Sequence, residues 1–134
     1  MEGSVKDLSK YRLARAREDL ETAKANYRNG SFRASVNRSY YAIFHALRAI
    51  AALDHFDSGK HSGIIAFINM KYVKTGVFDR GFSKAVDGAF RLREKADYDD
   101  FYVVAASDAE EQIKKADIIL TEVEAHLKER WRIL

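Results

Sequence analysis

The chain has 134 residues, the size of one domain, and its 47% hydrophobic and 32% charged residues exclude a disordered chain. The absence of cysteine excludes a disulfide framework and cysteine-based zinc sites, and a formal charge of +3 permits an anionic partner without demonstrating one. No apolar run approaches the roughly 20 residues of a membrane span, and the N-terminus is charged where a signal peptide is apolar. We therefore predict one cytoplasmic domain over residues 1–134, without membrane attachment.

Helical periodicity defines the first half of the chain, where no proline interrupts it. A helix is expected over residues 4–29, with Gly30 suited to the left-handed conformation that ends it and Ser31 able to cap the next helix. The second helix is expected over residues 32–53. Its apolar stripe repeats at intervals of four and three and comprises Val36, Tyr40, Ile43, Leu47 and Ile50.

The second half predicts further helices over residues 60–73 and 79–94. Residues 97–100 favour a loop, and residues 101–104 are predicted to form either a short strand or a docked extended segment. Ser107 and Glu110 match a capping box that would begin the last helix. Together these elements predict an all-α, up-and-down bundle of four to five helices.

The second helix carries a polar stripe opposite its apolar one. Successive helical residues rotate by about 100°, which places Arg38, Tyr41, His45 and Arg48 within about 80° of one another. Residues 34–52 contain no acidic residue, unlike an ordinary solvated face. The same face carries small residues that would let another backbone approach closely, and a second copy of the chain is one candidate for that backbone. These residues are Ala34, Ala42, Ala49 and Ala52.

Arginine and histidine at this spacing are sufficient to cleave RNA without a metal. Histidine can take the proton of a ribose 2′-OH, and arginine can stabilise the charge that develops on the phosphoryl oxygens. The expected products are a 2′,3′-cyclic phosphate and a 5′-hydroxyl. Taken alone, however, one Arg–His pair on a helix is more often a surface or interface polar pair than a catalytic one.

Other polar residues have more ordinary interpretations. Lys60 and His61 start the third helix and could contact a phosphate, although a helix-start loop is the commoner role. The four histidines lack the HxxxH or HxH spacing of a metal site, and we expect no metal and no cofactor. Trp131 is expected to pack in the chain or to anchor a dimer contact. A buried polar network is expected to hold residues 95–106 against the bundle, and it comprises Arg91, Arg93, Asp97 and Tyr98.

The sequence resembles the HEPN superfamily, particularly its small stand-alone prokaryotic members. The resemblance rests on Arg38, six residues and His45, within the segment NRSYYAIFHA. It continues in the segments KHSG at 60–63, VKTG at 73–76, RLR at 91–93 and ADY at 96–98. It implies a helical bundle that forms a homodimer, with the two Arg–His motifs in a composite cleft. It also implies the toxin half of a toxin–antitoxin pair, whose antitoxin is a minimal nucleotidyltransferase.

By this resemblance Arg38 and His45 are the catalytic residues. The residues expected to contact substrate or nucleotide are Asn37, Ser39, Tyr41, Arg48, Lys60 and His61. Ser39 departs from the Asn, Asp or His that active nucleases of the superfamily usually carry after the arginine.

Three functions remain open at this point. The first is a metal-independent endoribonuclease that acts as a homodimer. The second is a non-catalytic homodimer that binds nucleotide or RNA and is accessory to the nucleotidyltransferase. The third is a purely structural interaction module.

Overall fold

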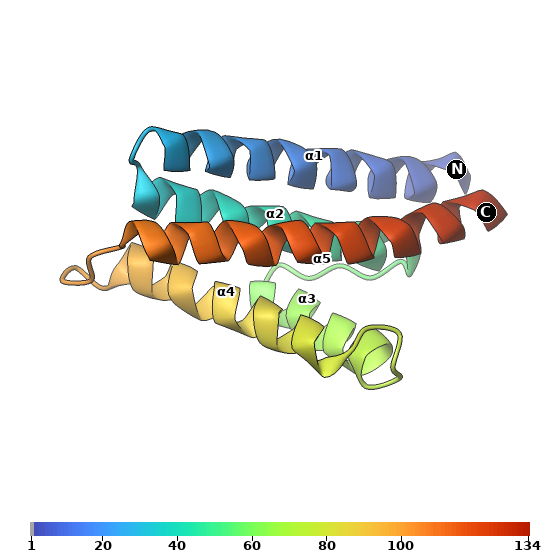
Figure 1. Cartoon of the computed structure of the whole chain (residues 1–134). Helices are drawn as coiled ribbons and strands as arrows, with labels where there is room; N and C mark the ends of the chain where they lie inside the picture. The colour runs from blue at the N-terminus through green and yellow to red at the C-terminus, as the bar shows by residue number, and fades with distance from the viewer. Residues whose placement is uncertain (1) are drawn as a thin grey trace.

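Five helices make up the computed structural model, which describes residues 2–134, with side chains described from residue 5 onward. Helix α1 spans Glu2–Arg28, α2 spans Phe32–Leu53 and α3 spans His61–Ile68, which a π-helical turn extends over Asn69–Val73. Helix α4 spans Arg80–Tyr98 and α5 spans Ala106–Ile133. No strand occurs over residues 2–134, which confirms the predicted all-α bundle (Figure 1).

Helix α2 is the centre of the bundle and packs against α1, α3, α4 and α5. Its apolar stripe is fully buried, as predicted: Tyr40, Ile43, Leu47 and Ile50 are at most 1% exposed. A smaller apolar cluster joins the start of α2 to the loop after α4, through Val36, Ala96, Val104 and Ala109. Burial on several sides fixes α2 as a rigid element from which the polar stripe projects.

The predicted helix boundaries hold for α2 but differ elsewhere. Gly30 has φ +76° and ends α1 as expected, whereas Ser31 makes no side-chain capping hydrogen bond. Helix α4 continues to Tyr98 instead of ending near residue 94, so the predicted loop at 97–98 is wrong. The physical reason is an ion pair one helical turn apart, in which Arg93 Nε lies 3.0 Å from Asp97 Oδ2.

The start of α5 also differs from the prediction. The helix begins at Ala106, and the Ser107–Glu110 capping box does not form. Instead, Asp108 Oδ2 accepts hydrogen bonds from the Ala105 backbone N–H at 3.0 Å and from the Tyr102 hydroxyl at 2.9 Å. These bonds tie the preceding loop to α5. Residues 101–104 therefore form no strand: Phe101 lies in a turn, and Tyr102 and Val104 pack this irregular loop against the bundle.

Small residues on α2 admit a neighbouring backbone, but that backbone is α1 of the same chain. Ala42 and Ala49 are fully buried. Ser9 Oγ donates a hydrogen bond of 2.8 Å to the carbonyl oxygen of Ala49, and Arg12 Nη1 donates one of 3.1 Å to that of Arg48. A second copy therefore does not cover Ala42 and Ala49, whereas Ala34 remains exposed. Over residues 2–134, no helix combines the length and hydropathy needed to cross a membrane.

Candidate functional site

The polar stripe of α2 meets a polar stripe of α1, and one carboxylate joins them. Asp19 of α1 places Oδ1 3.3 Å from Arg38 Nη1 and Oδ2 3.6 Å from His45 Nε2. Asp19 Oδ2 is buried and has no hydrogen-bond partner among the described residues. The structure thus brings Arg38 and His45, the two predicted catalytic residues, to opposite oxygens of a single carboxylate.

His45 is held in its neutral form. Its side chain is 12% exposed, and burial lowers its pKa from 6.5 to about 4. The positive charges of Arg15, Arg48, Arg38 and Arg12 lower the pKa in the same direction. At neutral pH the contact with Asp19 is therefore one between a carboxylate and an uncharged imidazole, and not a salt bridge. An uncharged imidazole is the form that can accept a proton.

Arginine side chains dominate the charge around His45. Arg12 and Arg15 project from α1 toward the same region as Arg38 and Arg48 of α2. Arg12 and Arg48 share the carboxylate of Asp57, at 3.8 and 3.4 Å. Arg15 is exposed and makes no ion pair with any residue of the described chain. Four guanidinium groups facing two carboxylates leave a net positive site that suits a phosphate group.

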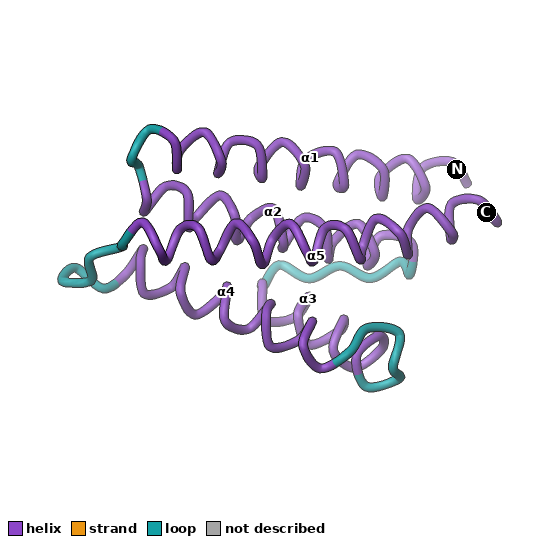
Figure 2. The backbone as a smooth tube through the Cα atoms, viewed as in Figure 1, coloured by secondary structure: helices purple, strands orange, loops and turns teal. Residues whose placement is uncertain are grey.

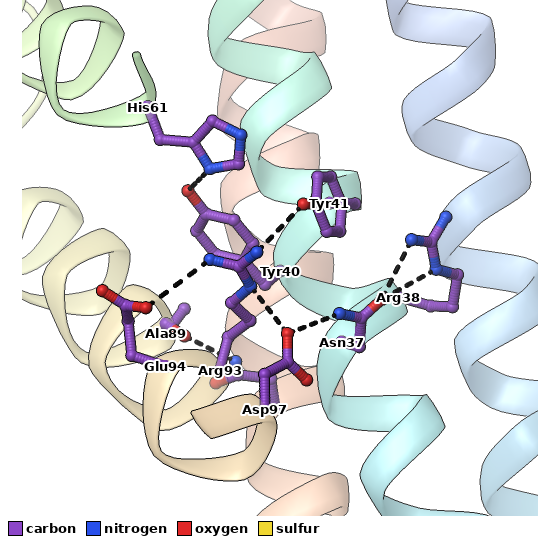
Figure 3. A network of polar contacts seen from close by, with 10 residues as sticks. Asn37, Arg38, Tyr40, Tyr41, His61, Ala89, Arg93, Glu94 and Asp97 are labelled. Carbon is purple, nitrogen blue, oxygen red and sulfur yellow. Dashed lines mark hydrogen bonds and ion pairs between the residues drawn. The ribbon is translucent and has the colours of Figure 1, made fainter. Parts of the chain in front are cut away.

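Arg38 is fixed by its neighbours before any ligand binds. Its Nε and Nη2 atoms donate hydrogen bonds of 3.1 and 2.9 Å to Asn37 Oδ1, and its guanidinium lies 4.8 Å from the centre of the Tyr41 ring. Asn37 in turn donates from Nδ2 to Asp97 Oδ2 at 3.0 Å. Figure 3 shows this chain of contacts from Arg38 through Asn37 to α4. Asn37 and Tyr41, both predicted site residues, therefore lie beside Arg38.

The polar network that the sequence predicted on α4 forms only in part. Arg93 pairs with Asp97 and donates from Nη2 to the Tyr41 hydroxyl at 3.1 Å (Figure 3). Tyr98 is 70% exposed and meets the network only through a contact of its ring with the Arg93 guanidinium. Arg91 is outside the network, because it pairs with Asp87 on the exposed side of α4. Through these contacts the network joins α4 to the part of α2 that carries Arg38.

His61 and Arg48 line a pocket at the other end of the stripe. The His61 ring stacks on Phe44 at 4.0 Å between centroids, and its Nδ1 shares a hydrogen bond of 3.0 Å with the Tyr40 hydroxyl. Burial lowers the pKa of His61, as do the charges of Arg93 and Arg48. The pocket has a volume of about 540 Å³ and is also bordered by Asp57.

Two predicted site residues lie apart from this group. Ser39 is fully buried, one residue and about 100° around the helix from Arg38, and its hydroxyl has no partner among the described residues. Lys60 is exposed at the start of α3, and no hydrogen bond or ion pair joins its side chain to Arg38 or His45. Trp131 packs within the chain, where its Nε1 donates to Ser9 Oγ at 3.0 Å.

Sequence reasoning missed the contribution of α1. Arg12, Arg15 and Asp19 recur at intervals of three and four, which places them on one helical face. That face flanks the buried positions Leu13, Ala16 and Leu20. The spacing was a usable signal, but it could not show that α1 packs in register with the stripe of α2.

Comparisons with known proteins identify the family of the chain. The HEPN domain family profile matches residues 9–126. A UPF0332 protein of Thermotoga maritima is 31% identical over 122 residues, which cover 91% of this chain and 92% of the relative. A Methanocaldococcus jannaschii protein named "Putative toxin MJ0605" is 31% identical over 114 residues, 85% of this chain and 84% of that protein.

The fold has a solved counterpart as well. The crystal structure of TT1696 from Thermus thermophilus matches with a TM-score of 0.75 at 18% identity, covering 87% of this chain and 96% of the other. The profile match extends from α1 into α5 and includes both Arg38 and His45. The chain belongs to the HEPN domain family.

Proposed function

We propose that this protein is a metal-independent endoribonuclease that acts as a homodimer. The observation that carries the proposal is the juxtaposition of an uncharged His45 and a fixed Arg38 at the two oxygens of Asp19, among further arginines. The imidazole supplies a proton acceptor, and the guanidinium groups supply donors for the oxygens of a phosphate.

In the proposed reaction, His45 takes the proton of a ribose 2′-OH. The 2′-oxygen attacks the adjacent phosphorus, the bond from phosphorus to the 5′-oxygen breaks, and a 2′,3′-cyclic phosphate forms. Arg38 and Arg15 stabilise the negative charge that builds on the non-bridging oxygens. The leaving 5′-oxygen takes up a proton from His45 of a second copy of the chain, whose pKa the negative charge of the bound phosphate raises so that this imidazole can carry the proton. DNA lacks the 2′-OH and does not react in this way.

The homodimer follows from the same chemistry. One His45 is available per chain, and the reaction needs both a proton acceptor and a proton donor. Pairing two copies along the edge that bears Arg38, Tyr41 and Arg48 would supply both. Repulsion between the two sets of arginines opposes this pairing, and an anion between them relieves it.

The proposal extends to a biological setting. The name of the Methanocaldococcus jannaschii relative describes a toxin, and cleavage of cellular RNA would be a toxic activity. We therefore propose that this protein is the toxin of a cytoplasmic pair, restrained by a cognate minimal nucleotidyltransferase antitoxin.

A second candidate function is favoured by one specific observation. Asp19 and Asn37 already occupy the Arg38 guanidinium, and Ser39 is buried where it cannot assist it. A site engaged in this way would bind nucleotide or RNA without cleaving it, as an accessory to the nucleotidyltransferase.

Cleavage of end-labelled RNA in excess EDTA tests the proposal. The wild type is expected to cut and leave cyclic phosphate ends, whereas Arg38→Ala and His45→Ala are expected to lose the activity. Arg91→Ala and His55→Asn are matched controls, because both residues are exposed and lie outside the site. An intact RNA after incubation with pure, dimeric wild type would leave the binding function as the answer.

A further inference from the structure

A pocket of about 930 Å³ opens beside the Arg38 end of the polar stripe. It lies between the start of α2 and the loop at 99–105, which meet at the same end of the bundle (Figure 2). Ligand pockets commonly have volumes of about 300–1,000 Å³, so this one has room for a nucleobase and its ribose. None of the catalytic steps proposed above uses it.

The pocket is continuous with the proposed phosphate site. Asn37 and Arg38 both line it, and Arg38 is the residue that Asp19 links to His45. Arg38 and His45 are seven residues apart on α2, about 10 Å along the helix axis. An RNA strand whose phosphate lies at His45 therefore places a neighbouring nucleotide at the mouth of this pocket.

The lining of the pocket suits a base better than a second phosphate. Part of its lining is apolar or aromatic and includes Phe32, Tyr102 and Val104. Its polar edge carries the carboxylates of Asp97 and Asp100, which repel phosphate and accept hydrogen bonds from the N–H groups of a base. Arg33 and Arg38 also line the pocket and supply positive charge for the phosphates of an RNA backbone.

The loop beside the pocket exposes apolar side chains to solvent. Phe101 is 94% exposed and Val103, which lines the pocket, is 83% exposed. Hydrogen bonds nevertheless hold the loop in place: Arg33 Nη2 donates to the Tyr102 carbonyl oxygen at 2.6 Å, and the Tyr102 hydroxyl donates to Asp108. Aromatic side chains are the platforms on which single-stranded nucleic acids stack their bases, and Tyr102 is the aromatic residue of this loop that lines the pocket.

We propose that this pocket is a base-binding subsite for single-stranded RNA, which holds the nucleotide next to the phosphate at Arg38 and His45. The inference rests on the proposed function and adds to it a determinant of sequence preference. Because the carboxylates of the pocket accept hydrogen bonds, the preferred base is one with adjacent donors on one edge. Guanine has two, the N1–H and the exocyclic amino group.

The test uses an exposed valine at the pocket and a matched one far from it. Val103→Asp places a negative charge at the mouth of the pocket without disturbing the core. Val77→Asp makes the same change at a 52% exposed valine in the loop before α4, at the opposite end of the bundle (Figure 2). The probe is a random-sequence 12-nucleotide pool with 2′-deoxy sugars and 5-iodouracil at scattered positions, which cannot be cleaved by attack of a 2′-OH.

The wild type and Val77→Asp are expected to bind the pool equally, and Val103→Asp about five- to tenfold more weakly. Irradiation is expected to cross-link the bound pool to the tryptic peptide 96–114, which contains Tyr102. Sequencing of the retained pool is expected to show guanine enrichment, which Asp100→Asn reduces. Equal binding by both aspartate variants, or cross-links elsewhere, would overturn the subsite and leave the exposed loop as a surface for a protein partner.

The outcome separates this inference from the nuclease. If the wild type binds the pool through residues 96–114 but does not cut RNA, the subsite stands and the endoribonuclease does not. If it cuts RNA and Val103→Asp neither weakens binding nor changes the base preference at the cut, the endoribonuclease stands and the subsite does not. Absence of both binding and cleavage would overturn both proposals.

Discussion

The Asp19 carboxylate of α1 and the His45 imidazole of α2 face each other across 3.6 Å, and the other Asp19 oxygen lies 3.3 Å from Arg38. A buried carboxylate normally finds hydrogen-bond donors for both oxygens, yet Oδ2 has none within the described chain. Burial raises the pKa of Asp19, against the opposing effects of Arg38 and Arg15. Asp19 thus has the position of a residue that orients both members of the motif.

We predict that Asp19→Asn lowers the rate constant for RNA cleavage by about 10- to 100-fold with little change in KM, because small displacements of reacting groups are costly. Glu18→Gln is the matched control, since Glu18 is the exposed neighbour of Asp19. Single-turnover kinetics with each variant provide the measurement. A rise in KM with an unchanged rate constant would show that Asp19 supports binding and not the orientation of His45.

The pKa of His45 provides a second prediction. A histidine NMR titration is expected to give a pKa near 4 in the free protein. Addition of inorganic phosphate should raise this value, because the anion offsets the surrounding arginines. The reciprocal effect is tighter phosphate binding as His45 becomes protonated. A pKa that stays unchanged at saturating phosphate would place the anion elsewhere.

The lowered pKa also predicts how stability depends on pH. Because the native pKa of His45 lies below its ordinary value of 6.5, the unfolded chain binds the proton first as the pH falls. The contribution of His45 to stability is therefore complete above pH 6.5 and declines toward pH 4. His61 and His126, whose pKa values burial also lowers, act in the same direction. Urea unfolding from pH 7 to pH 4.5 should show a smaller loss in the free energy of unfolding for His45→Gln than for the wild type.

Arg15 tests whether the site binds a phosphate backbone. This side chain is exposed and lies near His45, so its replacement should leave folding intact. We expect Arg15→Ala to weaken RNA binding for all sequences alike. The slope of log affinity against log salt should fall by about one, as one phosphate contact is lost. Arg91→Ala should change neither quantity.

Tyr40 links the core of α2 to the start of α3. Its hydroxyl shares a hydrogen bond with His61 Nδ1, and its ring is 1% exposed. We expect Tyr40→Phe to lower the free energy of unfolding by about 1 kcal/mol, because the aromatic packing remains and one hydrogen bond is lost. Chemical denaturation measures this change. Tyr11→Phe, at an exposed tyrosine, serves as the control.

Periodicity in the sequence was sufficient to determine the helices and the core. The stripe from Val36 to Ile50 predicted which face of α2 is buried, because burial of apolar side chains at helical spacing is a local property. The same arithmetic correctly placed Arg38, Tyr41 and His45 on one edge. It failed at the C-terminus of α4, where the Arg93–Asp97 pair determines the boundary, and at the N-terminus of α5, where the Asp108 carboxylate does.

Only the tertiary structure decided what surrounds His45. Residues 34–52 contain no acid, but packing of α1 against the alanines of α2 brings Asp19 to His45 and Arg38, and Arg12 and Arg15 to the same edge. Burial is the main cause of the lowered pKa of His45, and the positive charges that add to it come in part from a helix about 30 residues earlier in the chain. The Arg38–His45 motif is local to one helix. Its electrostatic environment depends on how α1 packs against α2, and the spacing of residues within one helix does not determine that packing.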